Sequence, residues 1–537
     1  MPEYRTESLP ALLRARAAEM PDRVYVVDVD DRQLTYSQMA EWMQRWAAAF
    51  KRVGVVAGEC VVSMQFNTIE SLAGWLGLAS LGVVEAAINT DYRGDLLVHA
   101  LNITRCRTMV LSRQFLDRVR DVADELKYLK TVVIVDTDSH LDDFPFAAVT
   151  ARDFFSGIRL EPFERNPEIS DIAAVLFTSG TTGPSKAVQM PWGQLLATAR
   201  YSLPLDDLNA GDVFFNAGPS YHIGAKVFPY QAALLGARHV IRPYVSESRL
   251  SAEYRKYGVT TCFYPPLMWL DEPARPDDAD CALRNLLFPI PLPQMAEFKK
   301  RFGCRTYSVY SMTELSCPIA DVTWDIGHIN PQGYFSCGKL RSGFPGYEAR
   351  IVDNMDREVA PGIVGELVVR ASEPWGMNAG YLNNPEATAA AWRNGWFHTG
   401  DAFFRDEDGY FYFRDRLKDC IRRKAENISS FEVEGSVKKH PAVADCAAVA
   451  AKMSEDPTAD EEIRLVVMRK PDSELSAEEL IRWMIPRVPR FMIPRFVEFM
   501  DELPRTPNLK IQKAVLRKSP MRKDVWDRDA AGIELPR

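Results

Sequence analysis

The chain has 537 residues, a length that favours two or more domains with large cores over one small domain. Its 73 acidic and 65 basic residues give a net charge of −8 without long runs of one sign, which argues against a dedicated nucleic-acid binder and gives no signal for an anionic membrane surface. Hydrophobic residues make up 47% and charged residues 26%, as in folded globular proteins.

Cysteine usage and the N-terminal sequence bear on the compartment. The nine cysteines are scattered without a CxxC pair, so they predict neither a zinc site nor a disulfide framework. The first residues carry charge throughout and lack the apolar core of a secretory signal. The uncharged run 71–84 is shorter than the roughly 20 residues that a membrane span needs. We therefore expect a cytoplasmic protein without a membrane span.

The first third of the chain alternates helix and strand patterns. Thr35 and Gln38 form a capping box before apolar residues at helical spacing, and Gly54 ends that helix. An apolar run at 59–64 predicts a strand, and a second helical pattern covers 69–81. This alternation predicts an α/β fold with a largely parallel sheet.

The middle of the chain changes character. Residues 108–111 and 131–135 read as fully buried strands of the same sheet. Beyond Phe335 the pattern changes to shorter strands between turn residues, with 347–352 and 365–369 as the clearest candidates. We expect a β-rich subdomain there.

A charge-dense segment at 413–419 predicts a domain boundary. The residues after it show a strand pattern at 464–468 and a helix that begins with a capping box of Ser476 and Glu479. We predict a large N-terminal domain of layered α/β sheets over residues 1–414 and a small α+β C-terminal domain over 415–537.

A loop rich in hydroxyls and glycines follows the apolar run 173–177. It reads Thr178, Ser179, Gly180, Thr181, Thr182, Gly183, Pro184, Ser185, Lys186. Glycines let backbone amides approach an anion, hydroxyls donate further hydrogen bonds, and the lysine adds charge, so such a loop can wrap phosphates. Its spacing is not that of a Walker A loop. Composition alone favours an ordinary polar turn over a phosphate loop.

In its full order, this string resembles the phosphate loop of the adenylate-forming superfamily, which contains acyl-CoA synthetases, adenylation domains and luciferases. Four further motifs of the family follow in the family's order: YSMTE at 310–314, GWFHTGD at 395–401, DRLKD at 415–419 and PRTPNLKIQK at 504–513. The likeness covers nearly the whole chain. Residues 426–429 and the non-glycine stretch from Phe288 look similar to the carnitine and crotonobetaine CoA ligase branch.

The resemblance implies a nucleotide site. The loop from Thr178 to Lys186 and Thr313 would contact phosphate, and Glu314 would hold Mg²⁺, a hard cation that takes carboxylate and phosphate oxygens. Tyr310 would offer a flat face to adenine. Asp401 would accept hydrogen bonds from the ribose hydroxyls, with the guanidinium of Arg416 nearby.

The resemblance also implies a reaction. Lys510 would be the catalytic lysine, carried on a small domain that swings about Lys418, and would neutralise charge on the α-phosphate. His222 would line the acyl pocket, although a lone histidine is often structural. Ala425 and Leu509 stand where many relatives carry glycine, and 288–291 replaces a glycine-rich stretch; these departures bear mainly on the second half of the reaction.

The predicted activity is ATP-dependent conversion of a small carboxylic acid to its acyl-AMP, with release of pyrophosphate and transfer of the acyl group to coenzyme A. One alternative is an adenylating enzyme with another acceptor, such as a carrier protein, an amine or another nitrogen nucleophile. Another is a nucleotide-binding relative without catalysis. The candidate acyl-pocket residues are mixed in size and polarity and do not identify the acid: Tyr221, His222, Ala225, Val309 and Cys317. The sequence does not indicate the oligomeric state.

Overall fold

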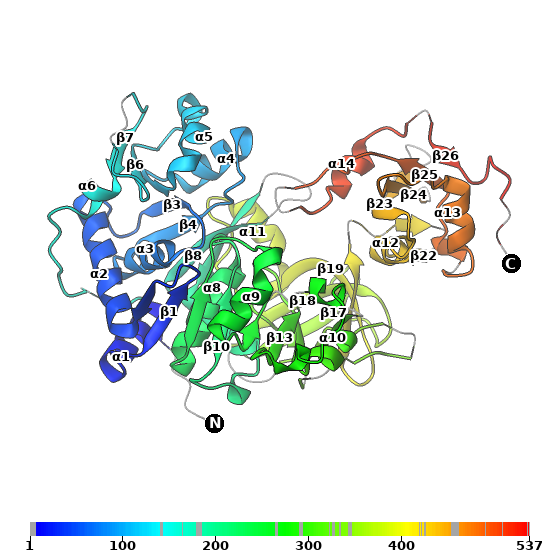
Figure 1. Ribbon diagram of the computed structural model, residues 1–537. Helices are drawn as coiled ribbons and strands as arrows, with labels where there is room; N and C mark the ends of the chain where they lie inside the picture. Colours follow the sequence, from blue (N-terminus) through cyan, green and yellow to red (C-terminus); the bar gives the residue numbers. More distant parts are fainter. Residues whose placement is uncertain are drawn as a thin grey trace.

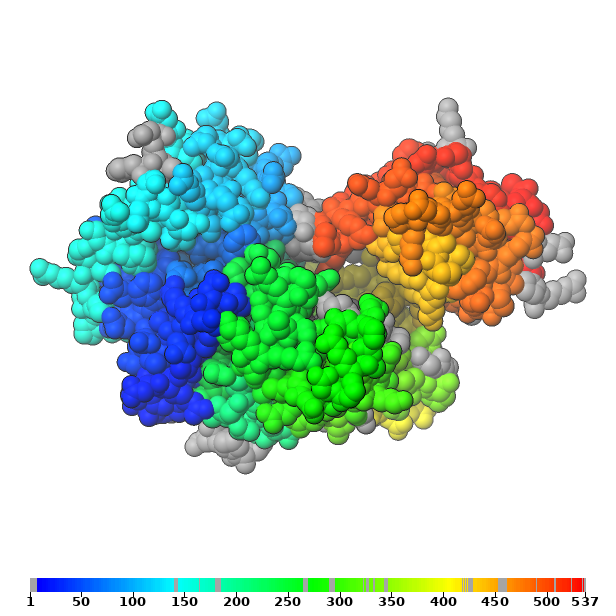
Figure 2. Space-filling model, viewed as in Figure 1, coloured from blue at the N-terminus to red at the C-terminus, as the bar shows by residue number. Residues whose placement is uncertain are grey.

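The computed structural model forms a large domain and a smaller one beside it (Figure 1). It describes residues 7–139, 143–163, 165–178, 185–263, 267–288, 294–321, 323–324, 328–331, 334–341, 346–417, 419, 421–423, 426–452, 461–488, 490–506, 509–522, 524–533 and 535. The two bodies differ clearly in size, as the space-filling view also shows (Figure 2).

One sheet of the large domain is almost entirely parallel. Its order is β7-β6-β5-β3-β4-β8-β9, and β8 with β9 is its antiparallel pair. The strands are β3 Cys60–Met64, β4 Val84–Ala87, β5 Thr108–Leu111, β6 Thr131–Ile134, β7 Ala147–Thr150, β8 Ile172–Thr178 and β9 Lys186–Pro191. The predicted strands at 59–64, 108–111 and 131–135 are confirmed, and so is the parallel arrangement.

A second sheet contains thirteen strands among the described residues. Its parallel part comprises β1 Val24–Asp28, β10 Val213–Asn216, β11 Arg238–Ile241, β12 Thr261–Cys262, β13 Asn285–Phe288 and β14 Arg305–Tyr310, with β2 Gln33–Thr35 antiparallel at the edge. Its antiparallel part comprises β15 Ile319–Ala320, β16 Gly338–Leu340, β17 Tyr347–Val352, β18 Gly365–Ala371, β19 Phe397–Arg405 and β20 Tyr410–Arg416.

The β-rich region beyond Phe335 is thus confirmed, but it is not a separate sheet. Strand β15 pairs with β14, so the antiparallel strands extend the parallel sheet. The sequence pattern shows the change of strand length and not this pairing.

Helices between the two sheets form the shared core. They are α1 Leu9–Glu19, α2 Tyr36–Arg52, α3 Ile69–Ser80, α7 Trp192–Tyr201 and α8 Ile223–Leu235, and their buried side chains pack with strands of both sheets. The predicted capping box of Thr35 and Gln38 is present, with both hydrogen bonds formed. The other helices of the large domain are α4 Gly94–Thr104, α5 Leu116–Arg120, α6 Ala151–Phe155, α9 Glu247–Tyr257, α10 Gln294–Phe302 and α11 Pro385–Ala391.

The small domain is built on a four-stranded sheet with the order β23-β24-β25-β26. Its strands are β23 Val443–Lys452, β24 Glu461–Arg469, β25 Phe496–Phe499 and β26 Trp526–Asp527, and its helices are α12 Ser430–Val437, α13 Ala477–Met484 and α14 Lys513–Lys518. A two-stranded ribbon, β21 Ile421–Arg423 with β22 Glu426–Ile428, precedes them. The α+β character is confirmed, as is the capping box of Ser476 and Glu479.

The division at residues 414 and 415 stays a prediction, and strand β20 continues to Arg416 in the large sheet. In the part of the chain that the structure describes, no helix combines the length and apolar character that crossing a bilayer requires.

A buried ion pair links the parallel sheet to helix α8. The Lys226 ammonium lies 2.6 Å from the Glu85 carboxylate, and the two side chains are 5% and 4% exposed. Ser63 donates a hydrogen bond to the same carboxylate, and the ammonium lies 3.9 Å from the centre of the Trp75 ring. Each charge therefore depends on these few partners, because water does not reach it.

Replacing Lys226 with methionine should lower the free energy of unfolding by about 3 to 5 kcal/mol, since the Glu85 charge would stay buried without its cation. Adding Glu85→Gln to this variant should recover part of the loss. Thermal and denaturant unfolding measure both effects. Lys256→Ala is the control, because its ion pair with Asp31 is exposed and should be worth about 1 kcal/mol or less. Equal losses for both lysine variants would contradict the prediction.

Candidate functional site

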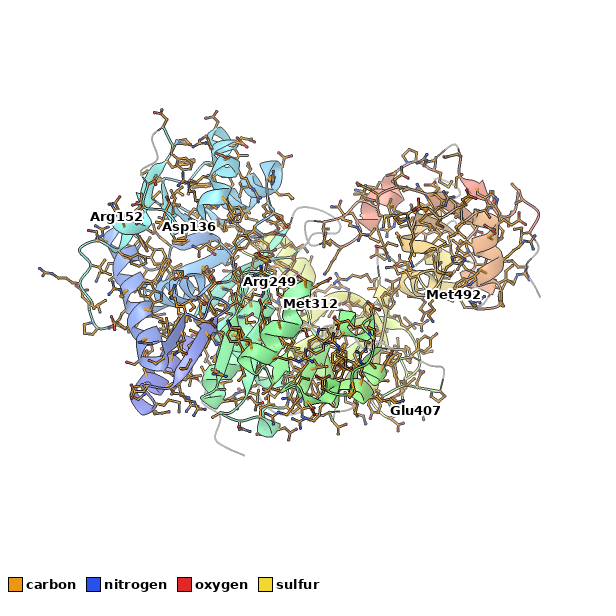
Figure 3. All side chains as sticks on the ribbon, viewed as in Figure 1. Asp136, Arg152, Arg249, Met312, Glu407 and Met492 are labelled. Carbon is orange, nitrogen blue, oxygen red and sulfur yellow. The ribbon has the colours of Figure 1, made fainter. Side chains whose placement is uncertain are left out.

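A cavity of about 1040 Å³ is lined by residues of both domains. Its walls come from the ends of β8 and β9, from α7 and α8, from the turn after β14, and from β19 and β20. Lys510, Ile511 and Lys513 of the small domain complete the lining. Figure 3 labels Met312 of the turn after β14, in the large domain.

The phosphate loop predicted from the sequence spans β8 and β9. Thr178 and Lys186 pair across these two strands, and both line the cavity. The Lys186 ammonium lies 4.7 Å from the centre of the Tyr381 ring. Of the predicted loop residues between them, Ser185 also lines the cavity, and the others fall outside the described residues: Ser179, Gly180, Thr181, Thr182, Gly183 and Pro184. The two ends of the predicted loop therefore lie at the cavity wall.

Thr313 and Glu314 follow β14 and line the same cavity. The Glu314 side chain is buried, and the Tyr381 hydroxyl donates a hydrogen bond of 3.1 Å to its carboxylate. Burial raises the pKa of Glu314, and this hydrogen bond, Arg416 and Lys186 oppose the shift. Tyr381 thus contacts both the lysine of β9 and the carboxylate after β14.

Asp401, Tyr310 and Arg416 come together from three strands, β19, β14 and β20. The Tyr310 hydroxyl donates a hydrogen bond of 2.7 Å to the Asp401 carboxylate, and the Arg416 guanidinium lies 3.0 Å from its other oxygen. Asp401 is 2% exposed, while the Arg416 side chain is 43% exposed and lines the cavity. The acidic group is therefore fixed in place, and the guanidinium is open to a ligand.

The bulge in strand β19 that carries Asp401 is held by Glu366 of β18. One carboxylate oxygen of Glu366 accepts a hydrogen bond of 3.0 Å from the Gly400 amide, and the other lies 2.8 Å from Nδ1 of His398. Gly400 has a φ of +70°, a conformation that glycine adopts without steric cost. The Thr399 hydroxyl accepts from the Asp401 amide and donates to the Leu367 carbonyl.

Lys510 reaches the cavity on a short loop of the small domain. The Thr506 amide donates to the Lys510 carbonyl at 2.7 Å, and the Lys510 amide lies 3.2 Å from the Thr506 hydroxyl. The side chain keeps surface exposed toward the open cavity. Nevertheless, the protein atoms crowded around it lower the pKa of Lys510, and Arg416 adds to this effect while Asp401 opposes it.

His222 precedes α8 and also lines the cavity. Burial lowers the pKa of His222 to about 4, with a further contribution from the Lys510 charge. The imidazole is therefore neutral at pH 7. Lys510, Glu314 and His222, predicted from separate motifs, all line one cavity.

Contacts across residues 414–434 join the small domain to the large one. The Arg414 guanidinium lies 2.6 Å from the Glu432 carboxylate, and Asp415 accepts hydrogen bonds from the Ser430 amide and hydroxyl. Lys513 donates to that same hydroxyl at 2.6 Å. The predicted hinge residue Lys418 and the departure at Ala425 lie outside the described residues.

The side of the cavity around His222 is mainly apolar. Ile223, Val227, Phe263, Val309, Met312 and Cys317 line it, together with the hydroxyl-bearing Thr198 of α7 and Ser202 directly after it. Of the predicted pocket residues, His222, Val309 and Cys317 are among this lining, whereas Tyr221 and Ala225 are not. Phe288 is fully buried in the core beneath, and Pro289–Pro291 are not described.

Several residues of the cavity were not found from the sequence: Tyr381, Glu366, Phe263, Thr198 and Ser202. Tyr381 and Glu366 stand outside the predicted motifs, and their partners are 67 and 34 positions away in the sequence. Thr198 of α7 and Ser202, its C-cap residue, form an i, i+4 pair, a spacing that places them on one helical face without showing what that face contacts.

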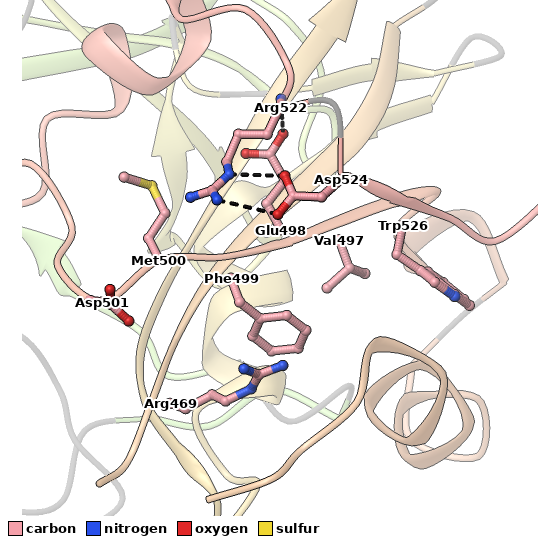
Figure 4. A pocket seen from close by; sticks show the side chains of 9 residues that line it. All are labelled: Arg469, Val497, Glu498, Phe499, Met500, Asp501, Arg522, Asp524 and Trp526. Atoms are coloured by element: carbon pink, nitrogen blue, oxygen red, sulfur yellow. Dashed lines mark hydrogen bonds and ion pairs between the residues drawn. The ribbon is translucent and has the colours of Figure 1, made fainter.

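A smaller cavity of about 330 Å³ lies on the small domain, between β24, β25 and β26 (Figure 4). The charges of Arg522 and Asp524 pair with one another there at 3.0 Å, and the Arg469 guanidinium lies 3.5 Å from the centre of the Phe499 ring. We assign no function to this cavity.

Leu509, next to Lys510, has a φ of +59° and is 75% exposed. A side chain with a Cβ is strained in this left-handed conformation, typically by about 1 to 2 kcal/mol. Leu509, where the family resemblance led us to expect glycine, therefore has the backbone conformation that favours glycine.

Leu509→Gly should raise the free energy of unfolding of the small domain by about 1 kcal/mol, because the strain is relieved. Leu509→Ala is the matched control: it removes the exposed side chain but keeps the Cβ, and should leave stability nearly unchanged. Differential scanning calorimetry measures both. A glycine variant no more stable than the alanine variant would show that the loop is not strained.

Comparisons with known proteins agree with this geometry. Residues 13–382 match the family model described as AMP-binding enzyme, and residues 432–510 match that of the AMP-binding enzyme C-terminal domain. The crotonobetaine/carnitine–CoA ligase of Salmonella heidelberg is 30% identical over 499 residues, which cover 90% of this chain and 93% of that protein. The protein of the same name from Salmonella typhi is also 30% identical over 499 residues, with the same coverage.

Solved structures share the fold at lower identity. The anthranilate CoA ligase AuaEII with anthranoyl-AMP is 23% identical, with a TM-score of 0.80 and coverage of 96% of this chain and 97% of that one. The o-succinylbenzoate CoA synthetase of Bacillus subtilis with AMP is 22% identical, with a TM-score of 0.79 and coverage of 95% and 98%. With both family models matched and a relative at 30% identity over nine tenths of its length, the chain belongs to the family of AMP-binding, adenylate-forming enzymes.

Proposed function

We propose that the protein activates a carboxylic acid with ATP, releases pyrophosphate, and transfers the acyl group from the acyl-AMP to coenzyme A. One observation carries this proposal: Lys510 of the small domain lines the same cavity as Glu314 and Lys186 of the large domain. This cavity places cations of two domains near one carboxylate. Such an arrangement suits the binding of a polyphosphate beside a carboxylic acid with which it reacts.

The nucleotide would occupy the side lined by Lys186, Thr313 and Arg416. Lys186 and Thr313 would hold phosphates by charge and hydrogen bonding. The Asp401 carboxylate, fixed by Tyr310, would accept hydrogen bonds from the ribose hydroxyls. The close packing of Tyr310 against Asp401 and Phe403 supports a role in shaping the adenine site.

Magnesium fits the donor set as a ligand shared with the nucleotide. Glu314 is a buried carboxylate at the cavity wall, and the described residues include no group of three metal-binding side chains that would form a closed cage. Mg²⁺ is held in many sites by one or two carboxylates together with substrate phosphates and water. When bound beside Glu314, it would neutralise phosphate charge.

In the first step, a carboxylate oxygen of the acid attacks the α-phosphorus of ATP. A phosphorus–oxygen bond forms to the acyl group, and the bond to the leaving pyrophosphate breaks. Lys510 stabilises the negative charge that develops on the transferring phosphate. In the second step, the thiol of coenzyme A attacks the acyl carbonyl, AMP leaves, and the thiol proton passes to solvent.

Coenzyme A is the acceptor that the relatives support, since the Salmonella proteins are named CoA ligases. Pyrophosphate release measured across a panel of carboxylic acids, with and without coenzyme A, tests both steps. Acid-dependent pyrophosphate with thioester formation is expected. Acyl-AMP without thioester would exclude coenzyme A as the acceptor, and nucleotide binding without pyrophosphate for any acid would overturn the proposal.

Lys510→Ala should reduce acyl-AMP formation by on the order of 10²-fold or more, the usual effect of removing one electrostatic stabiliser of a transition state. Thioester formation from acyl-AMP supplied to the variant should be much less affected, because no triphosphate is involved. Lys518→Ala, an exposed lysine of the same domain, is the control. Unchanged acyl-AMP formation in Lys510→Ala would show that Lys510 is not the catalytic lysine.

The rate of acyl-AMP formation should fall at alkaline pH. The cation of Lys510 is present below its pKa and is lost as pH rises through it, and crowding places that pKa below the ordinary lysine range. The decline in kcat/KM should therefore begin at a lower pH than an ordinary lysine would give. In Lys510→Arg the decline should disappear, whatever the absolute rate, because a guanidinium stays charged. An unchanged decline in Lys510→Arg would show that another group is responsible for it.

A further inference from the structure

Part of the cavity lining comes from α8 and from the end of α7. Ile223 and Val227 of α8, Thr198 of α7 and Ser202, the residue that follows α7, belong to this lining. Within each pair the two positions are four residues apart in helical backbone, so they lie on one face. On α8 the lining thus continues one helical turn past Ile223, the residue after His222.

The charged side chains that line the cavity lie elsewhere. Among the described lining residues, the acidic ones are Glu314, Glu366 and Asp419, which come from the turn after β14, from β18 and from the hinge region. Between α7 and α8 the described lining is apolar or carries a hydroxyl. A charged group placed there would lose its hydration without gaining an ionic partner from these side chains.

The Ser202 hydroxyl is a polar group in the part of the cavity between α7 and α8. It is 3% exposed, and its hydroxyl accepts a hydrogen bond of 3.0 Å from the Gln231 amide. The described residues offer that hydroxyl no acceptor for its own proton. Thr198 differs, because its hydroxyl donates to the Gln194 carbonyl of its own helix at 2.8 Å.

Gln231 fixes the direction of the Ser202 hydroxyl. It is fully buried, one turn beyond Val227 on α8, and its amide also donates to the Ala199 carbonyl at 2.8 Å. The Gln231 carbonyl oxygen has no hydrogen-bond partner among the residues that the structure describes. Ser202 therefore has a hydroxyl proton to donate, and the buried carbonyl oxygen of Gln231 can accept a hydrogen bond.

We propose that the acid is a monocarboxylic acid with an apolar body and a distal, uncharged oxygen, a hydroxyl or keto group, that accepts a hydrogen bond from Ser202. This inference rests on the proposed function, because it places the acyl group in the part of the cavity beyond His222. Val227, Phe263 and Val309 contact the apolar body, and Ser202 donates a hydrogen bond to the oxygen at its far end.

The physical basis is discrimination by an unpaired polar group. A site built to hydrogen-bond a substrate oxygen rejects an analogue without it, since the buried hydroxyl is then left unsatisfied. A methylene more or less in an apolar pocket gives only weak discrimination. Ser202 is therefore expected to determine selectivity more strongly than the apolar lining does.

The test uses pairs of acids with the same carbon skeleton, with and without a distal hydroxyl or keto oxygen, over aliphatic acids of four to eight carbons and over phenyl-substituted acids. Acid-dependent pyrophosphate release gives kcat/KM for each. In at least one pair, we expect the oxygenated acid to be preferred by about tenfold or more. Dicarboxylic acids and acids with a trimethylammonium group should react more slowly than acids of similar size whose tail is uncharged.

Ser202→Ala should reduce that preference to about threefold or less, mainly by slowing the oxygenated acid. Thr198→Val, which also lines the cavity, is the matched control and should keep the preference ratio, since its hydroxyl is used within α7. The inference would be overturned if Ser202→Ala kept the preference for the oxygenated acid. It would also be overturned if the unsubstituted acid or the acid with a charged tail were preferred in every reacting pair. Absence of pyrophosphate release with every acid would instead overturn the proposed function.

Discussion

The candidate site depends on one constraint: an ammonium carried by the small domain must be held beside the carboxylate and cations of the large domain. Two like charges, Lys510 and Arg416, are close enough that one lowers the pKa of the other, and Asp401 offsets only part of that effect. Such an arrangement is unfavourable until an anion enters. The geometry therefore favours a polyphosphate ligand, whose charge would relieve the repulsion.

The surrounding structure maintains this arrangement from both sides. In the large domain, Glu366 holds the β19 bulge that carries Asp401, and Tyr310 holds the carboxylate itself. Toward the small domain, the contacts of Arg414 with Glu432 and of Asp415 with Ser430 lie within a few residues of the predicted hinge. These contacts join residues on either side of that hinge, so they bear directly on which orientation of the small domain is stable.

The acyl side of the cavity is organised differently from the nucleotide side. In our proposal, phosphate recognition would use charges near the strand ends, whereas the part of the cavity between α7 and α8 offers apolar surface and a hydroxyl oriented by Gln231. The Salmonella relatives are named for crotonobetaine and carnitine. In this chain, however, the described lining between α7 and α8 offers no carboxylate to a cationic tail, which is why we propose an acid whose tail is uncharged.

The sequence by itself determined the α/β class and the capping boxes at Thr35 and Ser476, because these depend on local spacing, and its resemblance to a known family singled out Glu314, Asp401 and Lys510. Only the tertiary structure decided that the antiparallel strands extend the parallel sheet, since strand pairing joins residues far apart in the chain. It also brought Tyr381 to Glu314, Glu366 to Gly400 of β19, and Gln231 to Ser202. Each of these contacts links different elements, and helix or strand periodicity shows which face a residue occupies but not what that face meets.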